Sequence, residues 1–345
     1  MVEFRCLIKT TNPRRAFYMF YRDNNTNTEQ VFQDIRKNGK KNDWQGKKIA
    51  NVNYANLLSE LHYRKAANVK ICAEIMRFEP TDTGHLKLKQ TWFCKSKLCP
   101  LCNWRRSMKH SNQVVQVIDE AVKREPSGRF LFWTLTSKNT YDGQELKKAL
   151  SEMSEAFRKL VQYKKVKQNL LGFLRATEVT VNPKDNSYNQ HMHVLVFVKS
   201  TYFKDAKNYI TQVELTDFWQ RALQVDYKPI VNVKAVKPKG NVQGEKGLVG
   251  AVYETAKYPV KSVDYLTDNY ENNLKRIEDL EKGLYRKRLI SYGGLFKIIR
   301  KEFQLDDVEE DDLLTTDSEE DNEATTGKEI VAYWNWERKN YFIKK

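Results

Sequence analysis

The chain has 345 residues, of which 40% are hydrophobic, so it can form two or three units with cores of their own. No apolar run approaches the roughly 18 residues of a membrane span, and the first residues lack the apolar core of a signal peptide. We therefore expect a cytoplasmic protein without a membrane partner. The net charge is +16, and residues 306–323 contain eleven acidic residues and no Lys or Arg, which leaves +27 on the rest. This excess favours a polyanionic partner, most simply nucleic acid, although a ribosome-associated or merely well-solvated basic protein is the alternative.

Residues 1–65 form a basic N-terminal region in which aromatic side chains are interleaved with lysines and arginines. Tyr54, Leu57, Leu58 and Leu61 recur at helical spacing, which predicts a helix over residues 51–65. No motif in this region indicates a particular chemistry.

Three of the five cysteines lie close together in the motif Cys94-x4-Cys99-x2-Cys102, which is typical of a metal site in a reducing compartment. Thiolates at this spacing converge on one tetrahedral Zn²⁺, which is normally closed by four ligands. The other interpretation is three small buried hydrophobic residues. The candidates for the fourth ligand are, in order of preference, Cys72, His85 and His110.

The cysteine motif leads into a predicted helix, and the two together form a unit of zinc knuckle and helix over residues 66–125. The apolar stripe of this helix is more typical of a core than of a ligand site. Its first turns carry three basic residues, Arg105, Arg106 and Lys109. We predict that these three side chains contact DNA phosphates, with a solvated helix face as the alternative.

Residues 126–268 are predicted to form a compact α+β unit. Its expected strands are 129–136, 172–182, 190–198 and 230–236, and its expected helices are 144–164 and 213–224. The turn-rich residues 183–189 join the second and third strands into an antiparallel hairpin. His191 and His193 open the third strand, and because strand side chains alternate, both point to the face that Leu195 and Phe197 also occupy.

Glu178 lies in the middle of the other hairpin strand, where an unpaired ionised group would be costly. We predict a register that places Glu178 opposite His193 and Thr180 opposite His191, with all four on one face. Two imidazoles and one carboxylate, with open positions left over, predict a catalytic site for Mg²⁺ or Mn²⁺, and zinc would also fit. The alternative is that Glu178 pairs with a nearby Arg or Lys and the histidines are ordinary polar strand residues.

A second set of polar residues follows in Glu254-x3-Tyr258-x2-Lys261. If residues 248–257 are helical, Glu254 and Tyr258 share one face, and Pro259 ends the helix. A metal on the histidine strand would polarise a DNA phosphodiester for in-line attack by the Tyr258 hydroxyl, which yields a 5′-phosphotyrosyl enzyme and a free 3′-hydroxyl. Glu254 would later act as general base toward water, and Lys261 would balance charge on the phosphate.

These motifs, together with Thr134-Leu-Thr136 and the segment from Phe93 to Arg106, resemble the replication initiators of Gram-positive rolling-circle plasmids, within the HUH endonuclease superfamily. Further motifs at 287–294 and 334–342 resemble one subgroup of these initiators. The resemblance implies a central antiparallel sheet flanked by helices, in an α+β nuclease core, and a nick at the double-strand origin of plasmid DNA. It also implies host helicase and polymerase as partners, Tyr258 as the initiating nucleophile, and Glu254 as the residue that promotes termination.

Three segments follow the predicted nuclease unit. Residues 269–304 are predicted to be a helical region interrupted at Gly293-Gly294, with an apolar stripe that suits a core or a homodimer contact. Residues 305–327 are predicted to be a disordered acidic linker that serves solvation, with mimicry of DNA as the alternative. The tail, residues 328–345, carries aromatic and basic residues that either dock on the body of the protein or stack on bases. The stripe consists of Leu274, Ile277, Leu280 and Leu284.

Two other functions are compatible with parts of this pattern. A transposase or relaxase of the same superfamily would share the metal and the tyrosine, but the zinc knuckle and Glu254-x3-Tyr258 favour a plasmid initiator. A non-enzymatic zinc-knuckle DNA-binding regulator would leave the histidines without a role. The function predicted from the sequence is therefore that of a site-specific DNA endonuclease and strand transferase.

Overall fold

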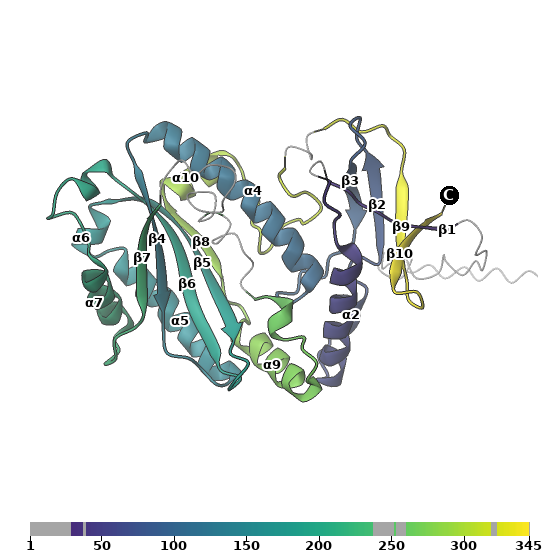
Figure 1. Cartoon of the computed structure of the whole chain (residues 1–345), viewed down its shortest axis with the longest axis horizontal. Coiled ribbons are helices and arrows are strands. Elements are labelled where there is room, and N and C mark those ends of the chain that lie inside the picture. Colours follow the sequence, from purple (N-terminus) through teal and green to yellow (C-terminus); the bar gives the residue numbers. More distant parts are fainter. Residues whose placement is uncertain (1–28, 37–38, 237–251, 253–259, 319–322, 345) are drawn as a thin grey trace, which may run out of the picture.

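The computed structural model describes residues 29–36, 39–236, 252, 260–318 and 323–344, which form two five-stranded antiparallel sheets and the helices around them (Figure 1). The larger sheet has the strand order β7-β4-β6-β5-β8, and the smaller sheet has the order β1-β10-β9-β2-β3. The α+β class predicted from the sequence is confirmed, but the smaller sheet is an addition that the sequence did not predict. Residues 290–294, which lie in the region predicted to be helical, form the edge strand of the larger sheet because they pair with residues 172–176. None of the helices in the described part of the chain could serve as a membrane span.

The larger sheet is covered by helices on both faces (Figure 1). Residues of α5 and α7 pack on one face, and residues of α4 and α10 pack on the other. Both faces of β6 are therefore buried, which is why its sequence from Val194 to Val198 is continuously apolar. The strands are β4 (Arg129–Thr136), β5 (Leu170–Val181), β6 (Tyr188–Val198), β7 (Val231–Val236) and β8 (Ile290–Gly294). The helices are α4 (Pro100–Arg124), α5 (Gly143–Leu160), α6 (Lys164–Lys167), η2 (Ser200–Phe203), α7 (Gln212–Leu223) and α10 (Leu295–Glu302).

The smaller sheet joins segments from both ends of the described chain. Strand β1 pairs with β10, and β2 pairs with both β3 and β9. Trp334 and Tyr341 of the tail are buried in this unit, so the tail docks on the body, which is one of its two predicted roles. The strands are β1 (Glu29–Val31), β2 (Ile75–Pro80), β3 (Leu86–Thr91), β9 (Ile330–Asn335) and β10 (Asn340–Lys344), with α2 (Trp44–Glu60) and α3 (Ala66–Lys70) beside them.

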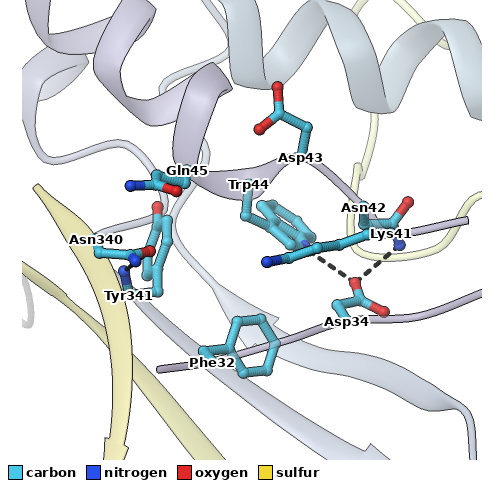
Figure 2. A pocket seen from close by; sticks show the side chains of 9 residues that line it. All are labelled: Phe32, Asp34, Lys41, Asn42, Asp43, Trp44, Gln45, Asn340 and Tyr341. Atoms are coloured by element: carbon cyan, nitrogen blue, oxygen red, sulfur yellow. Dashed lines mark hydrogen bonds between the residues drawn. The ribbon is translucent and has the colours of Figure 1, made fainter. Parts of the chain in front are cut away.

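Helix α2 begins earlier than the predicted 51–65, because Asp43 provides an N-cap. Its carboxylate accepts a hydrogen bond from the backbone N–H of Gly46 at 2.9 Å. A second carboxylate, that of Asp34, accepts hydrogen bonds from Trp44 Nε1 at 2.7 Å and from Asn42 Nδ2 at 2.8 Å (Figure 2). The three residues line a small pocket at the start of the helix, and their hydrogen bonds fix α2 to the chain that follows β1.

Helix α9 (Tyr270–Gly283), which follows the short turn η3 (Ser262–Asp264), lies between α5 and α2. Ile277, Leu280 and Leu284 of its apolar stripe are buried, and they share one cluster with Leu146 of α5. Gly283 permits this close approach, since a Cβ there would lie 2.5 Å from a methyl group of Leu146. Leu274, the fourth residue of the stripe, is partly buried against the same cluster. The stripe therefore belongs mainly to the core, which is the first of its two predicted roles, rather than to a homodimer contact.

The acidic segment between α10 and β9 is ordered over its described residues, so the predicted disordered linker is corrected for that part. Val308, Leu313 and Thr316 are buried, and the segment lies along α4. The physical reason is that basic residues of α4 are buried and need partners, which the acidic segment supplies.

Candidate metal centres and active site

The hairpin of β5 and β6 places the predicted metal ligands on the face of the larger sheet that also carries α4. Glu178 lies directly opposite His191, and Ala176 lies opposite His193. The predicted register, which placed Glu178 opposite His193 and Thr180 opposite His191, is therefore wrong by two residues. A shift of two residues keeps every side chain on its face, so the three ligands still converge.

The turn between the two strands explains the difference in register. Asn182 donates its backbone N–H to Ser187 O at 2.8 Å, so the turn is centred one residue earlier in the chain than the predicted register requires. Asn186 adopts a left-handed conformation with a φ of 57°, which asparagine tolerates better than most residues. A four-residue turn with this backbone conformation fixes which residues face each other across the hairpin.

The three side chains of this group point at one another. Glu178 Oε2 lies 3.0 Å from Nε2 of His191 and 3.0 Å from Nε2 of His193. The two imidazole rings are 4.7 Å apart and nearly perpendicular. Thr134 and Thr136 of β4 pair with His193 and His191, so the Thr-Leu-Thr segment borders the same group.

The charge of Glu178 is balanced on both of its oxygens. Burial raises the pKa of the Glu178 carboxyl, but the hydrogen bonds and charges of His191 and His193 outweigh burial and hold the pKa well below its usual range. Lys261 Nζ lies 3.5 Å from Oε1, the oxygen that the histidines do not contact. Glu178 is therefore an ionised carboxylate that faces the histidines with one oxygen and a lysine with the other.

This donor set fits a divalent cation. One oxygen and two nitrogen atoms, each on a side chain of a rigid hairpin, lie within 4.8 Å of one another. Two imidazoles and a carboxylate leave open coordination positions, which is the arrangement of a catalytic rather than a structural site. Glu178, His191 and His193 are therefore the residues that would hold the cation.

Asp264 lies near this group, although nothing in the sequence pointed to it, and Tyr265 follows it in the chain. Burial raises the pKa of Asp264, and the charges of Lys261 and Glu178 also act on it, which places this carboxyl close to the group. Tyr265 is fully buried and donates its hydroxyl to the carbonyl oxygen of Leu98. Tyr265 is thus held away from solvent and is not available as a nucleophile.

The cysteines form the second group. Cys72 Sγ lies 3.6 Å from Cys102 Sγ and 3.7 Å from Cys99 Sγ, and Cys94 Sγ lies 3.7 Å from Cys102 Sγ. Four thiolates bound at about 2.3 Å to a tetrahedral Zn²⁺ would lie about 3.8 Å apart, so the spacing fits that ion. The structure thus places Cys72, the preferred fourth candidate, in the group.

The two histidine alternatives lie elsewhere. His85 Nδ1 is 3.3 Å from Ile35 O, and His110 packs edge-on against the ring of Tyr292. Neither belongs to the cysteine group of the described residues.

Helix α2 supplies polar contacts to the cysteine group that the sequence did not predict. Asn51 Nδ2 donates to Cys99 Sγ at 3.3 Å, and Lys48 Nζ donates to Cys72 O at 2.6 Å. Burial lowers the pKa of Lys48, while the neighbouring thiol groups oppose that shift. A buried lysine beside four thiols offsets part of the negative charge that a metal with four thiolates would carry.

The three basic residues predicted to contact DNA are buried in this structure. Arg105 donates to the carbonyl oxygens of Leu313 and Leu314, and Lys109 forms an ion pair with Asp306 at 2.5 Å. Arg106 donates to backbone carbonyls that include Ser96 O at 3.1 Å. The predicted DNA contact of these residues is therefore corrected: they hold the acidic segment and the cysteine loop in place.

Glu254 and Tyr258 lie outside the described residues. The chain is described again from Val260, which is buried, and the next residue is Lys261. Lys261, three residues after the predicted nucleophile, therefore contacts the candidate metal group through its ion pair with Glu178.

Substitution Cys72→Ser tests the cysteine group. Removal of one of four thiolates is expected to weaken zinc binding more than tenfold and to remove zinc-dependent stability on the order of several kcal/mol. Zinc content and the free energy of unfolding, each with and without a chelator, measure both effects. Cys6→Ser, at the remaining cysteine of the chain, is the control. Full zinc occupancy in Cys72→Ser would contradict the assignment.

Substitution Glu178→Gln tests the histidine group. The amide has nearly the same shape but no charge, so Mn²⁺ affinity is expected to fall by more than about tenfold. Isothermal titration with Mn²⁺ measures the change. Glu152→Gln, which makes the same chemical change at an exposed position of α5, should leave the affinity unaltered. Equal affinities of the two variants would argue against Glu178 as a ligand.

Comparison with known proteins identifies the family. The family described as replication protein matches residues 85–342. A protein rep of Lentilactobacillus hilgardii is 50% identical over 316 residues, which cover 92% of this chain and 99% of the relative. A protein rep of Lactiplantibacillus plantarum is 51% identical over 316 residues, with 91% and 99% covered. A replication protein of Staphylococcus aureus is 56% identical over 238 residues, which are 69% of this chain and all of the relative. The chain therefore belongs to this family of replication proteins, the plasmid replication initiators.

Proposed function

We propose that this initiator starts rolling-circle replication by nicking one strand at the double-strand origin of its plasmid. The observation that carries the proposal is the convergence of Glu178, His191 and His193, with Lys261 at 3.5 Å from Glu178. Because a trans peptide chain advances at most about 3.6 Å per residue, the Cα of Tyr258 is within about 11 Å of that of Lys261. The predicted nucleophile is thus tethered to the metal group.

The phenol of tyrosine has an ordinary pKa near 10, so its attack on phosphate needs an activated electrophile. A Mg²⁺ or Mn²⁺ ion held by Glu178, His191 and His193 would withdraw charge from the scissile phosphate and orient it. Tyr258 Oη loses its proton and forms the new bond to phosphorus, while the bond to the 3′ oxygen breaks. The 3′ oxygen takes up a proton, which yields a 3′-hydroxyl for host polymerase and a 5′-phosphotyrosyl link.

Termination needs a second cleavage, for which Glu254 is the proposed general base. The carboxylate would take a proton from water as the water attacks phosphorus and the bond to the 3′ oxygen breaks. The 3′ oxygen would leave as a hydroxyl, so that this strand ends as a free 5′ phosphate instead of a second tyrosyl ester. Lys261 would balance the charge of the phosphate, since its ammonium group is half exposed and already pairs with a carboxylate. The energy of the phosphodiester is kept in the tyrosyl ester, so strand transfer needs no nucleotide cofactor.

The cysteine group is proposed to bind structural Zn²⁺. Cys99 caps the N-terminus of α4, and Cys102 lies in its first turn, whereas Cys72 precedes β2 of the smaller sheet. A metal shared by these segments would fix α4 relative to the smaller sheet. Because α4 also packs on the face that holds the histidines, the zinc would position the two sheets with respect to each other.

The proposed partners are plasmid origin DNA, in the cytoplasm, together with host helicase and polymerase. The rival hypotheses of a transposase or relaxase, and of a non-enzymatic regulator, are less well supported. The similarity to replication proteins extends over nearly the full length of two relatives. A regulator would have no use for a buried carboxylate that two histidines contact.

The nucleophile is tested by Tyr258→Phe. Loss of the hydroxyl is expected to reduce nicking and the covalent adduct to less than roughly a thousandth of their level, because no other group takes its place. Incubation with supercoiled origin DNA and Mn²⁺, followed by denaturing electrophoresis, detects the adduct. Tyr253→Phe is the matched control and should form it normally. An adduct that persists in Tyr258→Phe would overturn the assignment.

The role of Glu254 is tested separately. Glu254→Ala is expected to nick at a rate close to that of the unsubstituted protein, because the general base acts only in the second cleavage. Released monomeric circles should fall by about 10²-fold or more, and multimeric strands should accumulate in a replication assay. Equal loss of nicking and termination would show that Glu254 acts in the first step.

A further inference from the structure

At the edge of the larger sheet, a group of hydrogen-bond donors binds carboxylates of the acidic segment. We call residues 306–311 the acidic strap; they lie between α10 and β9, beside α4 (Figure 1). The Glu309 carboxylate accepts hydrogen bonds from the backbone N–H groups of Leu289, at 3.1 and 3.2 Å, and of Ile290, at 3.2 Å. The neighbouring Asp307 pairs with the guanidinium of Arg288. Three consecutive residues thus bind two carboxylates.

These donors have the composition of a phosphate site. Two adjacent backbone N–H groups and one guanidinium are the donors that proteins commonly present to a DNA phosphate, and carboxylates can take the same positions. Arg288 is half exposed, so a phosphate could reach it from solvent. The strap therefore occupies a site whose chemistry suits the backbone of a nucleic acid.

The site lies next to the metal group. Strand β8 pairs with β5 so that Ile290 faces Ala176, and Thr177 N donates to Leu289 O at 2.8 Å. Arg288 precedes this pairing on the side where Glu178 follows Ala176. Neighbouring strands are about 4.8 Å apart, so the donors stand one strand away from a ligand of the proposed cation. A DNA strand that reaches the metal group from this edge would meet them.

We propose that Arg288 and the backbone N–H groups of Leu289 and Ile290 form a binding site for a DNA backbone phosphate, and that Asp307 and Glu309 compete with DNA for it. The strap remains anchored to α4 while its carboxylates leave, because Leu313 beyond it is buried and receives Arg105 through its carbonyl oxygen. The inference rests on the proposed function only in naming DNA as the polyanion. It adds an internal competitor that lowers the affinity of the nuclease face.

Two adjacent glutamates provide a matched comparison. Glu309→Gln removes the charge that the N–H groups hold, whereas Glu310→Gln removes the same charge from an exposed side chain with no such contact among the described residues. Fluorescence anisotropy with a labelled single-stranded oligonucleotide of mixed sequence measures Kd, in the Tyr258→Phe background and without added Mg²⁺ or Mn²⁺. We expect Glu309→Gln to lower Kd about threefold to tenfold and Glu310→Gln to change it less than about twofold.

A second substitution shows whether the gain passes through the proposed site. Arg288→Ala is expected to raise Kd. It should also abolish most of the gain in affinity from Glu309→Gln, because the guanidinium and the backbone N–H groups that Glu309 occupies then no longer bind one phosphate together. Equal gains from Glu309→Gln and Glu310→Gln would overturn the proposal in favour of a general charge effect. So would a gain that is unchanged in Arg288→Ala.

Hydrogen exchange on the protein with an unsubstituted strap guards against variants that fold poorly. Addition of the oligonucleotide should increase amide exchange at Asp307 and Glu309, since DNA displaces their carboxylates and the Glu309 N–H then loses its hydrogen bond to Asp307 Oδ1. Unchanged or stronger protection there would show a fixed structural element and would overturn the proposal. These measurements need neither metal nor Tyr258. The binding proposal can therefore hold even if the protein does not nick DNA, and the nicking proposal can hold even if the strap does not compete with DNA.

Discussion

The contact between Glu178 and the two histidines is the constraint on which the rest of the site depends. A buried carboxylate is costly unless it is paired, and here both oxygens are committed, one to the imidazoles and one to Lys261. Only a register shift by an even number of residues would keep Glu178 on the face of the two histidines. A slip by one residue would turn Glu178 to the opposite face. The turn that ends at Ser187 therefore determines whether the three candidate metal ligands converge.

Helix α4 connects this site to the other half of the molecule. Its N-terminus lies in the cysteine group, and its later turns pack through Val114, Val117 and Ile118 on the face that carries the histidines. One helix thus connects the cysteine group to the face that carries Glu178 and the two histidines, which are the proposed structural and catalytic metal sites. Its buried basic residues explain why an acidic segment lies along it, since Lys109 is fully buried and needs charged or polar partners.

The two candidate metal groups could be predicted because they depend on local sequence patterns. Features that depend on pairing between distant parts of the chain could not. His191 and His193 follow from strand alternation, and Cys94, Cys99 and Cys102 follow from their spacing. The smaller sheet could not be predicted, because β1 and β2 find their partners in the last residues of the chain. The burial of Arg105 and Lys109 was missed for the same reason: their partners come from a segment about two hundred positions later. Arg106 has one partner in that segment and others in the cysteine loop.

The distribution of charge follows from this arrangement. A chain with an excess of basic residues would hold DNA strongly along its whole surface, yet an initiator must also release its origin. Where Lys109 of α4 and Arg288, which precedes β8, are paired with acidic residues of the chain, they add little to nonspecific attraction. Lys261 differs, because its partner Glu178 is a proposed metal ligand. A cation held by Glu178 would share the charge of that carboxylate and weaken the attraction that holds Lys261, so that the ammonium group of Lys261 could pair with the phosphate of the proposed substrate. Binding of the cation would then favour binding of the substrate, and binding of the substrate would favour binding of the cation.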